Sequence, residues 1–414
     1  MKYRKQEAKE YARSKLKGVW TALPTNFTDD DRLDEEGHIF NLDHCISELK
    51  IAGHYCLGNV AEFWSMTNQE RMRVHELNVQ AAKSRIPLIA GCHHQNPYEV
   101  VNLCRHAWDS GIDFAIILTP YVASNSDDAV YDFYSFVADR VDIGIVLFNI
   151  PTAYYPITEK LAKRLATIPN VCGFKQGGPS PAATINLREA VGKDVVVSVA
   201  DETPWFYNAA VMGDEWLLNF CPHLYQVPGH LPVHDYTEAV RAGDMNKAVA
   251  ICAGVNPYRA VHAKWITGYG RAVGRLPVHE QKVWMELLGM VGGPVRVPCG
   301  TRAPTNARRC APIWNRAACS GRCASLRRRS RSARPSDAGH GRQREVTAPD
   351  LPVVRDRRAC ALVPGAMDQP PRARGGGERR PCDHRQARPA HGRRAEAAVQ
   401  ADLSPGHDGH PDCP

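Results

Sequence analysis

Residues 171–180, VCGFKQGGPS, place a lysine where it could do chemistry. Lys175 stands at the end of a short apolar run, just before a glycine pair, although lysine is a poor strand former and is rarely buried without a reason. Among apolar strand ends an amine loses solvation, so its pKa falls and it becomes a nucleophile toward carbonyls. The glycine-rich turn beside it offers backbone N–H groups to a carboxylate. This pattern indicates a Schiff base with a 2-oxo acid.

Further candidate groups follow other apolar runs of the same kind. The run from residue 54 leads into the turn 58–61, and the run from residue 113 leads to Tyr121. The run from residue 144 ends with Phe148 and Asn149. If the runs are parallel strands of one sheet, their carboxyl ends meet on one face, and these groups gather around Lys175.

The spacing of the runs predicts that sheet. Eight short apolar, β-branched runs alternate with amphipathic helical stretches, and eight such alternations are the number that closes a (β/α)8 TIM barrel. Helix start signals support the alternation, namely capping boxes at Thr67–Glu70 and Asn96–Glu99 and an N-cap at Thr203 before Pro204. The runs begin at residues 18, 54, 87, 113, 144, 171, 195 and 215.

Three segments make up the predicted domain organisation. Residues 1–17 form an N-terminal helical extension, and residues 18–298 form the α/β barrel with extra C-terminal helices. Residues 299–414 form an Arg/Pro/Ala-rich tail with 23 Arg, no Lys and 11 acidic residues. The net charge of +8 therefore comes from the tail, while the first 298 residues carry −4. The positive charge of the whole chain therefore does not indicate that the barrel binds nucleic acid.

The composition of the tail argues against a packed core. It has no Phe or Tyr and only one Ile and one Trp, so we expect it to be disordered. A basic arm for anionic partners is one interpretation. Arg, Pro, Ala, Gly, Cys and His without Lys are also typical of a GC-rich gene read out of frame, which is the interpretation we favour.

Six motifs in order and spacing resemble the dihydrodipicolinate synthase/N-acetylneuraminate lyase family of class I pyruvate-dependent aldolases, over about residues 18–298. The resemblance implies that Lys175 forms the Schiff base with pyruvate and that the turn 58–61 holds the pyruvate carboxylate. It implies a homo-oligomer, a dimer or a homotetramer of tight dimers, and no cofactor beyond the covalent imine. The motifs are GVWTALPTNFTDDDRLDEEG, GNVAEFWSMTNQER, LTPY, FNIP, GFKQG and LLGMVGGPVR.

The remaining site residues are predicted from their places at the strand ends. The predicted catalytic set is Lys175, Tyr121 and Phe148, the last at the position of a family tyrosine. The substrate-binding set is Gly58, Asn59, Val60, Ala61, Asn149 and Tyr155.

The chain also departs from the family. Synthases of the family use a threonine and two tyrosines as a proton relay, and here these positions are Asn59, Val122 and Phe148. Phe148 cannot carry a proton. The arginine that synthases use for a second carboxylate aligns with Ala153. Other proton carriers are expected near the same face: Tyr121, Tyr154, Tyr155, His93, His94 and Glu62.

These departures favour a lyase with an apolar or aromatic aldehyde partner, like the family's hydratase-aldolases. We expect aromatic side chains around the substrate. Three alternatives stay open: a 4-hydroxy-tetrahydrodipicolinate synthase proper, a non-catalytic barrel that binds a 2-oxo acid, and a damaged gene product that lacks the family's last helix. The expected aromatic residues are Phe63, Trp64, Tyr154, Tyr155, Trp205 and Phe206.

Several other classes of function are disfavoured. The adjacent His93 and His94 have no carboxylate or third histidine at ligand spacing, so we predict no metal. The stretch 268–274, GYGRAVG, follows a helix instead of a strand and is no dinucleotide loop. The charged N-terminus is no secretory signal, and no apolar run is long enough to span a membrane. Scattered cysteines in apolar surroundings are typical of a cytoplasmic protein with reduced thiols. We also expect that the enzyme binds neither nucleic acid nor membrane.

Overall fold

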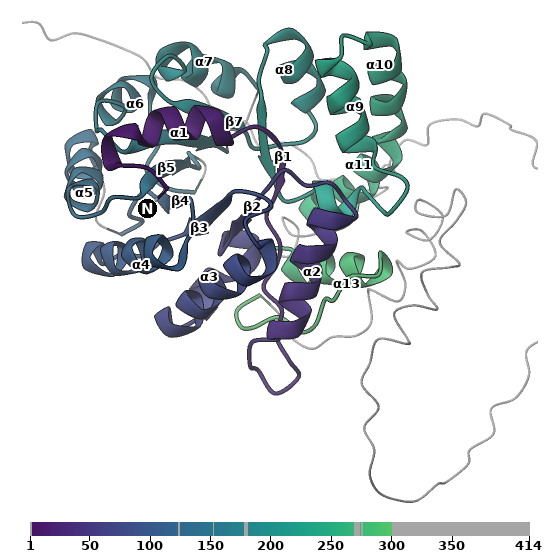
Figure 1. The fold of residues 1–414 in the computed structure, drawn as a ribbon, viewed down its shortest axis with the longest axis horizontal. Coiled ribbons are helices and arrows are strands. Elements are labelled where there is room, and N and C mark those ends of the chain that lie inside the picture. Colours follow the sequence, from purple (N-terminus) through teal and green to yellow (C-terminus); the bar gives the residue numbers. More distant parts are fainter. Residues whose placement is uncertain are drawn as a thin grey trace, which may run out of the picture. The chain divides into compact units, whose positions relative to one another are not determined.

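A computed structural model describes residues 2–122, 125–151, 153–177, 181–268, 274 and 276–299. Eight parallel strands close into a barrel in the order of the chain, with β1 paired to both β2 and β8 (Figure 1). The predicted (β/α)8 TIM barrel is confirmed, and every predicted run overlaps one strand. The strands are β1 (Gly18–Thr21), β2 (Gly53–Cys56), β3 (Leu88–Gly91), β4 (Phe114–Leu118), β5 (Gly144–Asn149), β6 (Val171–Gln176), β7 (Val196–Val199) and β8 (Trp216–Asn219).

Helices surround the barrel and extend it at the C-terminal side (Figure 1). The outer layer is formed by α2 (Glu35–Ser47), α3 (Asn68–Ala82), α4 (Pro97–Ser110), α5 (Asp127–Asp139), α6 (Glu159–Leu165), α7 (Pro181–Val191) and α8 (Trp205–Val211). The predicted C-terminal helical stretches contain α9 (Pro232–Arg241), which follows β8, packs on α8 and β1 and completes the outer layer. They also contain the extra helices α10 (Met245–Gly254), α11 (Asn256–His262) and α13 (Val278–Leu287).

Two of the three predicted helix starts have the expected N-cap. Thr67 and Glu70 form a reciprocal capping box at α3. Asn96 caps α4 through the Tyr98 N–H, but Glu99 accepts a hydrogen bond from Asn68 instead of completing the box.

The predicted start of α8 is wrong by one residue. Pro204 is the N-cap and Trp205 the first helical residue, so Thr203 lies outside the helix. The Thr203 N–H binds the Asp201 carboxylate, which holds the chain in a turn before the helix can begin.

The N-terminal extension is helical and closes the end of the barrel opposite the carboxyl ends of the strands. Its helix α1 (Ala8–Lys15) packs on β5, β6 and β7. The Tyr3 hydroxyl donates to the Asp113 carbonyl at 2.5 Å and accepts from the Gly144 N–H at 2.8 Å, at the starts of β4 and β5. The extension therefore stabilises the barrel without approaching the catalytic face.

Of the predicted tail, 299–414, all residues after Cys299 lie outside the described residues, as do Gly178 and most of the stretch 268–274. Among the helices of the described ranges, none is both long and apolar enough to cross a membrane.

Candidate active site

Lys175 lies at the carboxyl end of β6 with its side chain buried and only 7% exposed. Its neighbours in the sheet are Phe148 on β5 and Ser198 on β7. The Nζ atom lies 4.1 Å from the centre of the Phe148 ring and 5.0 Å from the centre of the Tyr55 ring. No ion pair or hydrogen bond to Nζ occurs within the described ranges. Aromatic faces thus provide the surroundings of this amine.

Burial without a carboxylate partner changes the protonation of Lys175. Desolvation lowers the pKa of the amine from 10.5 to about 7. About half of the molecules then carry the neutral, nucleophilic amine at neutral pH. An exposed lysine is almost fully protonated there, so the position gives Lys175 the reactivity that imine formation requires.

Lys175 lines a cavity of about 680 Å³ at the carboxyl ends of the strands. Apolar and aromatic side chains dominate its lining, and Lys175 is the only charged residue among the described lining residues. The lining consists of Ala22, Tyr55, Gly58, Asn59, Val60, Phe148, Ile150, Lys175, Gly177, Ala200, Phe220, Thr267, Gly274, Leu276, Pro277 and Gln281.

The predicted carboxylate-binding turn reaches the same cavity. Gly58, Asn59 and Val60 line it, and Asn59–Ala61 form a short 3-10 helix. The N–H groups of Ala61 and Glu62 donate back into the turn. The N–H groups of Asn59 and Val60 have no backbone acceptor among the described residues, as expected for the first N–H groups of a helical turn. Ala61 is buried beneath the turn, and its carbonyl accepts from Thr25 at 2.8 Å.

Glu62, expected as a proton carrier, serves as an anchor for this turn. Its Oε1 pairs with Lys282 Nζ at 2.8 Å, and both side chains are fully buried. Its Oε2 accepts the Arg296 backbone N–H at 2.8 Å. Glu62 also adopts a left-handed conformation, with φ 57°. The pair fixes the turn to α13 and to the segment that follows it, and the carboxylate has no route to substrate.

Three other predicted residues lie outside the lining of the cavity. Tyr121 is half exposed, and its ring lies 6.0 Å from that of Tyr154. The Tyr155 hydroxyl donates to Asp127 at 3.0 Å. The Asn149 amide binds Gln176 and both backbone groups of Ile157, so it holds β5 and β6 together. Their predicted substrate contacts remain predictions.

The aromatic lining differs from the expected set. Phe63, Trp64 and Phe206 do not line the cavity, and the buried Trp205 donates its indole N–H to Thr237 at 2.9 Å. The aromatic residues that do line it are Tyr55, Phe148 and Phe220. Tyr55 and Phe220 lie within a strand and just after one, where a sequence pattern shows burial but not which side of the strand faces the barrel interior.

Of two polar residues in the lining, Gln281 was not predicted from the sequence, whereas Asn59 was predicted to bind substrate as part of the turn 58–61. Gln281 on α13 is fully buried, and both its amide oxygen and nitrogen lack a hydrogen-bond partner among the described residues. The same holds for the amide oxygen of Asn59. Buried polar atoms are normally hydrogen-bonded, so these atoms indicate polar groups of a bound molecule.

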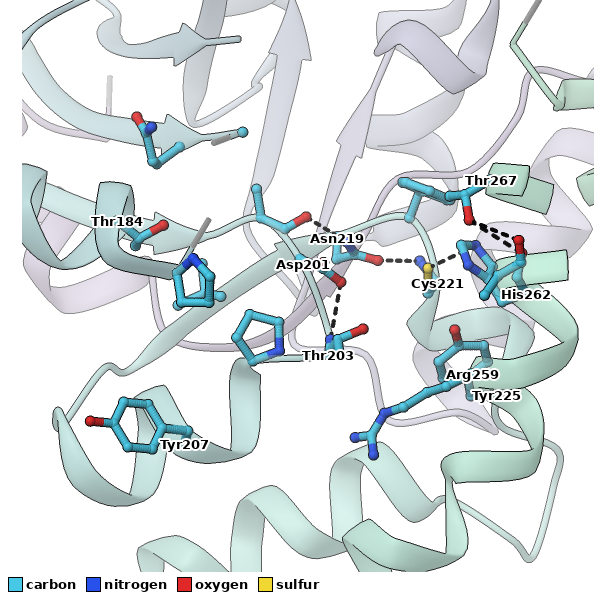
Figure 2. Close-up of a pocket in the computed structure, with 18 residues that line it drawn as sticks. Thr184, Asp201, Thr203, Tyr207, Asn219, Cys221, Tyr225, Arg259, His262 and Thr267 are labelled. Carbon is cyan, nitrogen blue, oxygen red and sulfur yellow. Dashed lines mark hydrogen bonds between the residues drawn. The ribbon is translucent and has the colours of Figure 1, made fainter. Parts of the chain in front are cut away.

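A second cavity, of about 730 Å³, adjoins the first at the ends of β7 and β8 (Figure 2). Figure 2 shows Asp201, Asn219 and Cys221 near the strand ends, with Arg259 and His262 from α11 opposite them. Arg259 pairs with the buried Glu202 carboxylate at 2.7 Å. Four residues line both cavities: Gly177, Ala200, Phe220 and Thr267.

The thiol and imidazole in the second cavity are both neutral. Cys221 Sγ lies 3.2 Å from His262 Nε2. Burial raises the pKa of the Cys221 thiol well above its ordinary value and lowers the pKa of His262 to about 4. The pair is therefore no activated thiolate, and Lys175 stays the best nucleophile of this face.

His93 and His94 are used separately. His93 Nε2 lies 2.8 Å from the Tyr55 hydroxyl, and its Nδ1 accepts the Leu118 N–H at 2.9 Å. His94 Nδ1 accepts the Asn96 N–H at 2.9 Å. No group of three or more His, Cys, Asp or Glu suited to a metal ion occurs in the part of the chain that the structure describes.

Comparison with known proteins agrees with this geometry. The model of the dihydrodipicolinate synthetase family matches residues 15–302. The chain belongs to that family. A 4-hydroxy-tetrahydrodipicolinate synthase of Methanothrix thermoacetophila is 32% identical over 296 residues, 70% of this chain and 93% of that protein. A synthase of Ehrlichia canis is 28% identical over 190 residues, 45% of this chain and 64% of that protein.

Solved structures of the family share the fold. A dihydrodipicolinate synthase from Aquifex aeolicus superposes with a TM-score of 0.63 at 22% identity, covering 72% of this chain and 97% of that one. A prophage protein of the family from E. coli K12, solved in complex with pyruvate, gives a TM-score of 0.64 at 21% identity, covering 73% and 98%. The predicted family and enzyme class, a carbon–carbon lyase of the class I aldolase type, are confirmed.

Proposed function

We propose that this family member binds pyruvate or a related 2-oxo acid as an imine on Lys175 and makes or breaks the adjoining carbon–carbon bond. The observation that carries the proposal is the buried, unpaired amine of Lys175 with its pKa lowered to about 7, beside the turn of Gly58–Val60. The amine provides the nucleophile, and the N–H groups of the turn donate hydrogen bonds to the carboxylate of the acid.

The chemistry needs no other cofactor. The neutral amine of Lys175 attacks the keto carbon, and the keto oxygen leaves as water after it takes one proton from the amine and one from an acid in the site, so a protonated imine remains. Loss of a proton from the neighbouring carbon gives an enamine, because the imine nitrogen takes up the electron pair. The enamine attacks an aldehyde in the condensation direction, and the reverse sequence cleaves the bond.

The lining of the cavity favours an apolar or aromatic aldehyde. Phe148, Ile150 and Phe220 offer burial to a hydrophobic group, which stabilises binding by about 25 cal/mol per Å² of apolar surface. Gln281 offers one amide donor and one acceptor to the aldehyde oxygen or a ring substituent. No second cation is available among the described lining residues for an aldehyde with its own carboxylate, since Arg259 nearby is neutralised by Glu202.

The second candidate is a 4-hydroxy-tetrahydrodipicolinate synthase proper, which the names of the relatives favour. The third, a non-catalytic barrel that binds a 2-oxo acid, is favoured by Phe148 at the position of the family's tyrosine. Both predict a pyruvate imine, so binding alone does not separate the candidates.

Turnover separates them. Pyruvate consumption is followed with benzaldehyde, with a short aliphatic aldehyde and with aspartate semialdehyde, using Lys175→Ala as the inactive control. We expect consumption with the apolar aldehydes and at least tenfold slower consumption with aspartate semialdehyde, because a missing charge-assisted hydrogen bond costs about 1.5–3 kcal/mol. Faster reaction with aspartate semialdehyde would favour the synthase, and no reaction with any aldehyde would favour the binding protein.

The predicted homo-oligomer also remains a proposal. It is supported by Tyr121 and Val122, which are 50% and 81% exposed after β4, an unusual place for large apolar side chains in a monomer. Sedimentation velocity tests it directly.

A further inference from the structure

Imine formation on Lys175 needs a proton donor that the family's usual position does not supply. Phe148 has no hydroxyl, and its ring faces the amine at 4.1 Å. Among the described lining residues, only Tyr55 and Thr267 carry hydroxyl groups. The Thr267 hydroxyl is directed to carbonyls of its own helix, those of His262 and Ala263. Tyr55 is left as the one candidate of this lining.

A backbone hydrogen bond fixes the direction of the Tyr55 hydroxyl. The Leu118 N–H donates to Nδ1 of His93, so this nitrogen carries no proton. The neutral imidazole then has its proton on Nε2, which donates to the Tyr55 oxygen at 2.8 Å. The hydroxyl oxygen accepts this bond, and no described residue accepts the hydroxyl's own hydrogen. That hydrogen is available to a molecule in the cavity.

Burial keeps His93 and Tyr55 in the protonation states that this hydrogen bond requires. Desolvation lowers the pKa of His93 well below its ordinary value, with smaller effects of Arg71 and Lys175, so the ring is neutral. Desolvation likewise raises the pKa of Tyr55 well above 10, so the residue remains a phenol. Glu62, the nearest buried carboxylate of the turn, is neutralised by Lys282 and does not act on either group.

The Tyr55 side chain is close to both the amine and the turn 58–61. The ring centre is 5.0 Å from Lys175 Nζ. A Cβ atom placed on Gly58 would lie only 3.2 Å from the hydroxyl oxygen, so the hydroxyl stands directly beside the turn. A 2-oxo acid with its carboxylate at this turn and its keto carbon at Nζ places its keto oxygen near the same hydroxyl.

We propose, on the basis of the proposed function, that Tyr55 is the catalytic acid of imine formation in this enzyme and that His93 is its positioning residue. When Lys175 Nζ bonds to the keto carbon, the carbonyl electron pair moves to oxygen, which takes the Tyr55 proton. The ammonium nitrogen returns a proton to the Tyr55 phenolate, which completes the carbinolamine. Tyr55 then protonates the departing hydroxyl, and water leaves as the nitrogen lone pair forms the imine.

The phenolate that remains is stabilised by the Nε2–H of His93 and by the adjacent iminium charge. It takes a proton from the carbon next to the imine, so the enamine forms and Tyr55 returns to its starting state. One residue thereby acts as acid and then as base without net gain or loss of protons. Tyr55 on β2, positioned by His93 after β3, performs the proton transfers that a tyrosine on β5 would otherwise perform.

Rapid-quench trapping with borohydride tests the role of Tyr55. Enzyme is mixed with pyruvate, quenched with sodium borohydride at increasing times, and the covalent adduct is measured by intact mass. For Tyr55→Phe we expect the trapping rate to fall about 100-fold, within the range typical of general acid catalysis, while the final extent stays unchanged. Tyr134→Phe is the matched control, because this buried tyrosine donates to the Ile117 carbonyl outside the site.

The positioning role of His93 has its own signature. His93→Leu removes the donor and should slow trapping about tenfold, whereas His93→Gln keeps an N–H donor and should restore most of the rate. Tyr55→3,5-difluorotyrosine keeps the hydroxyl but makes it more acidic, so it should alter the trapping rate even if Tyr55→Phe folds poorly.

The outcomes distinguish this proposal from the function on which it rests. Trapping by Tyr55→Phe at the unaltered rate, with the adduct on Lys175, overturns the role of Tyr55 and leaves the imine intact. An unaltered rate with difluorotyrosine also overturns it. Failure of the unaltered enzyme to trap pyruvate at all overturns the proposed function itself.

Discussion

Replacing Lys175 by methionine should make the fold more stable at neutral pH, and the gain should shrink as the pH rises. The lysine is buried against Phe148 and Tyr55 without a carboxylate partner. Its charged form is therefore disfavoured in the folded state but fully solvated in the unfolded state. Methionine has a similar length and carries no charge to desolvate.

The magnitude follows from the pKa of the amine. A pKa lowered from 10.5 to about 7 corresponds to about 5 kcal/mol of lost stability below pH 7, since each pKa unit is worth about 1.36 kcal/mol. Between pH 7 and 10.5 the unfolded state binds more protons than the folded state, so the stability of the unaltered protein rises with pH. The advantage of Lys175→Met should fall from about 5 kcal/mol at pH 6.5 to about 1 kcal/mol at pH 9.5.

Urea unfolding of both proteins across this pH range is the assay. The exposed Lys160→Met is the control and should change stability by less than about 0.5 kcal/mol at every pH. Differences in packing between lysine and methionine shift the whole curve but not its slope. A stability difference that does not vary with pH would refute the argument that Lys175 is buried in its neutral form.

Three further predictions follow from other features. Lys282→Met should lower the free energy of unfolding by about 3–5 kcal/mol in urea titrations, because it leaves Glu62 buried and unpaired; breaking the exposed Arg241–Glu238 pair should cost less than about 1 kcal/mol. The initial rate of pyruvate trapping should rise about tenfold per pH unit below pH 7 and level off above it, as the amine of Lys175 loses its proton; a rate still rising steeply above pH 9 would contradict this. Truncation after residue 299 should leave the melting temperature within a few degrees, as the tail's composition predicts; a larger loss in a thermal melt would show that the tail packs.

The fold could be predicted from the sequence because the period of the pattern is long and regular. Eight apolar runs at similar spacing admit few arrangements other than a closed parallel barrel. Lys175 could be predicted as well, because a charged residue that ends a buried strand contradicts the local pattern and calls for a reason. The start of α8 could not be placed, since the Asp201 carboxylate captures the Thr203 N–H and delays the helix.

The remainder of the cavity depends on contacts between distant segments. Tyr55 reads as one more residue of a buried strand, and its role emerges only because His93 and Leu118, from two other strand ends, fix its hydroxyl. Glu62 reads as a free acid in the sequence, but Lys282, 220 residues later, neutralises it. Gln281 lines the cavity from α13, a helix that follows the eight strand–helix units of the barrel. Sequence spacing contains no information on such pairings.

The central claim, an imine on Lys175, is tested most directly by reduction with sodium borohydride in the presence of pyruvate, followed by peptide mapping. We expect one pyruvate-derived group per chain, on the peptide that contains Lys175, and no adduct in Lys175→Ala at equal far-UV circular dichroism. An adduct on another lysine, such as Lys282, or no adduct on a folded protein, would contradict it.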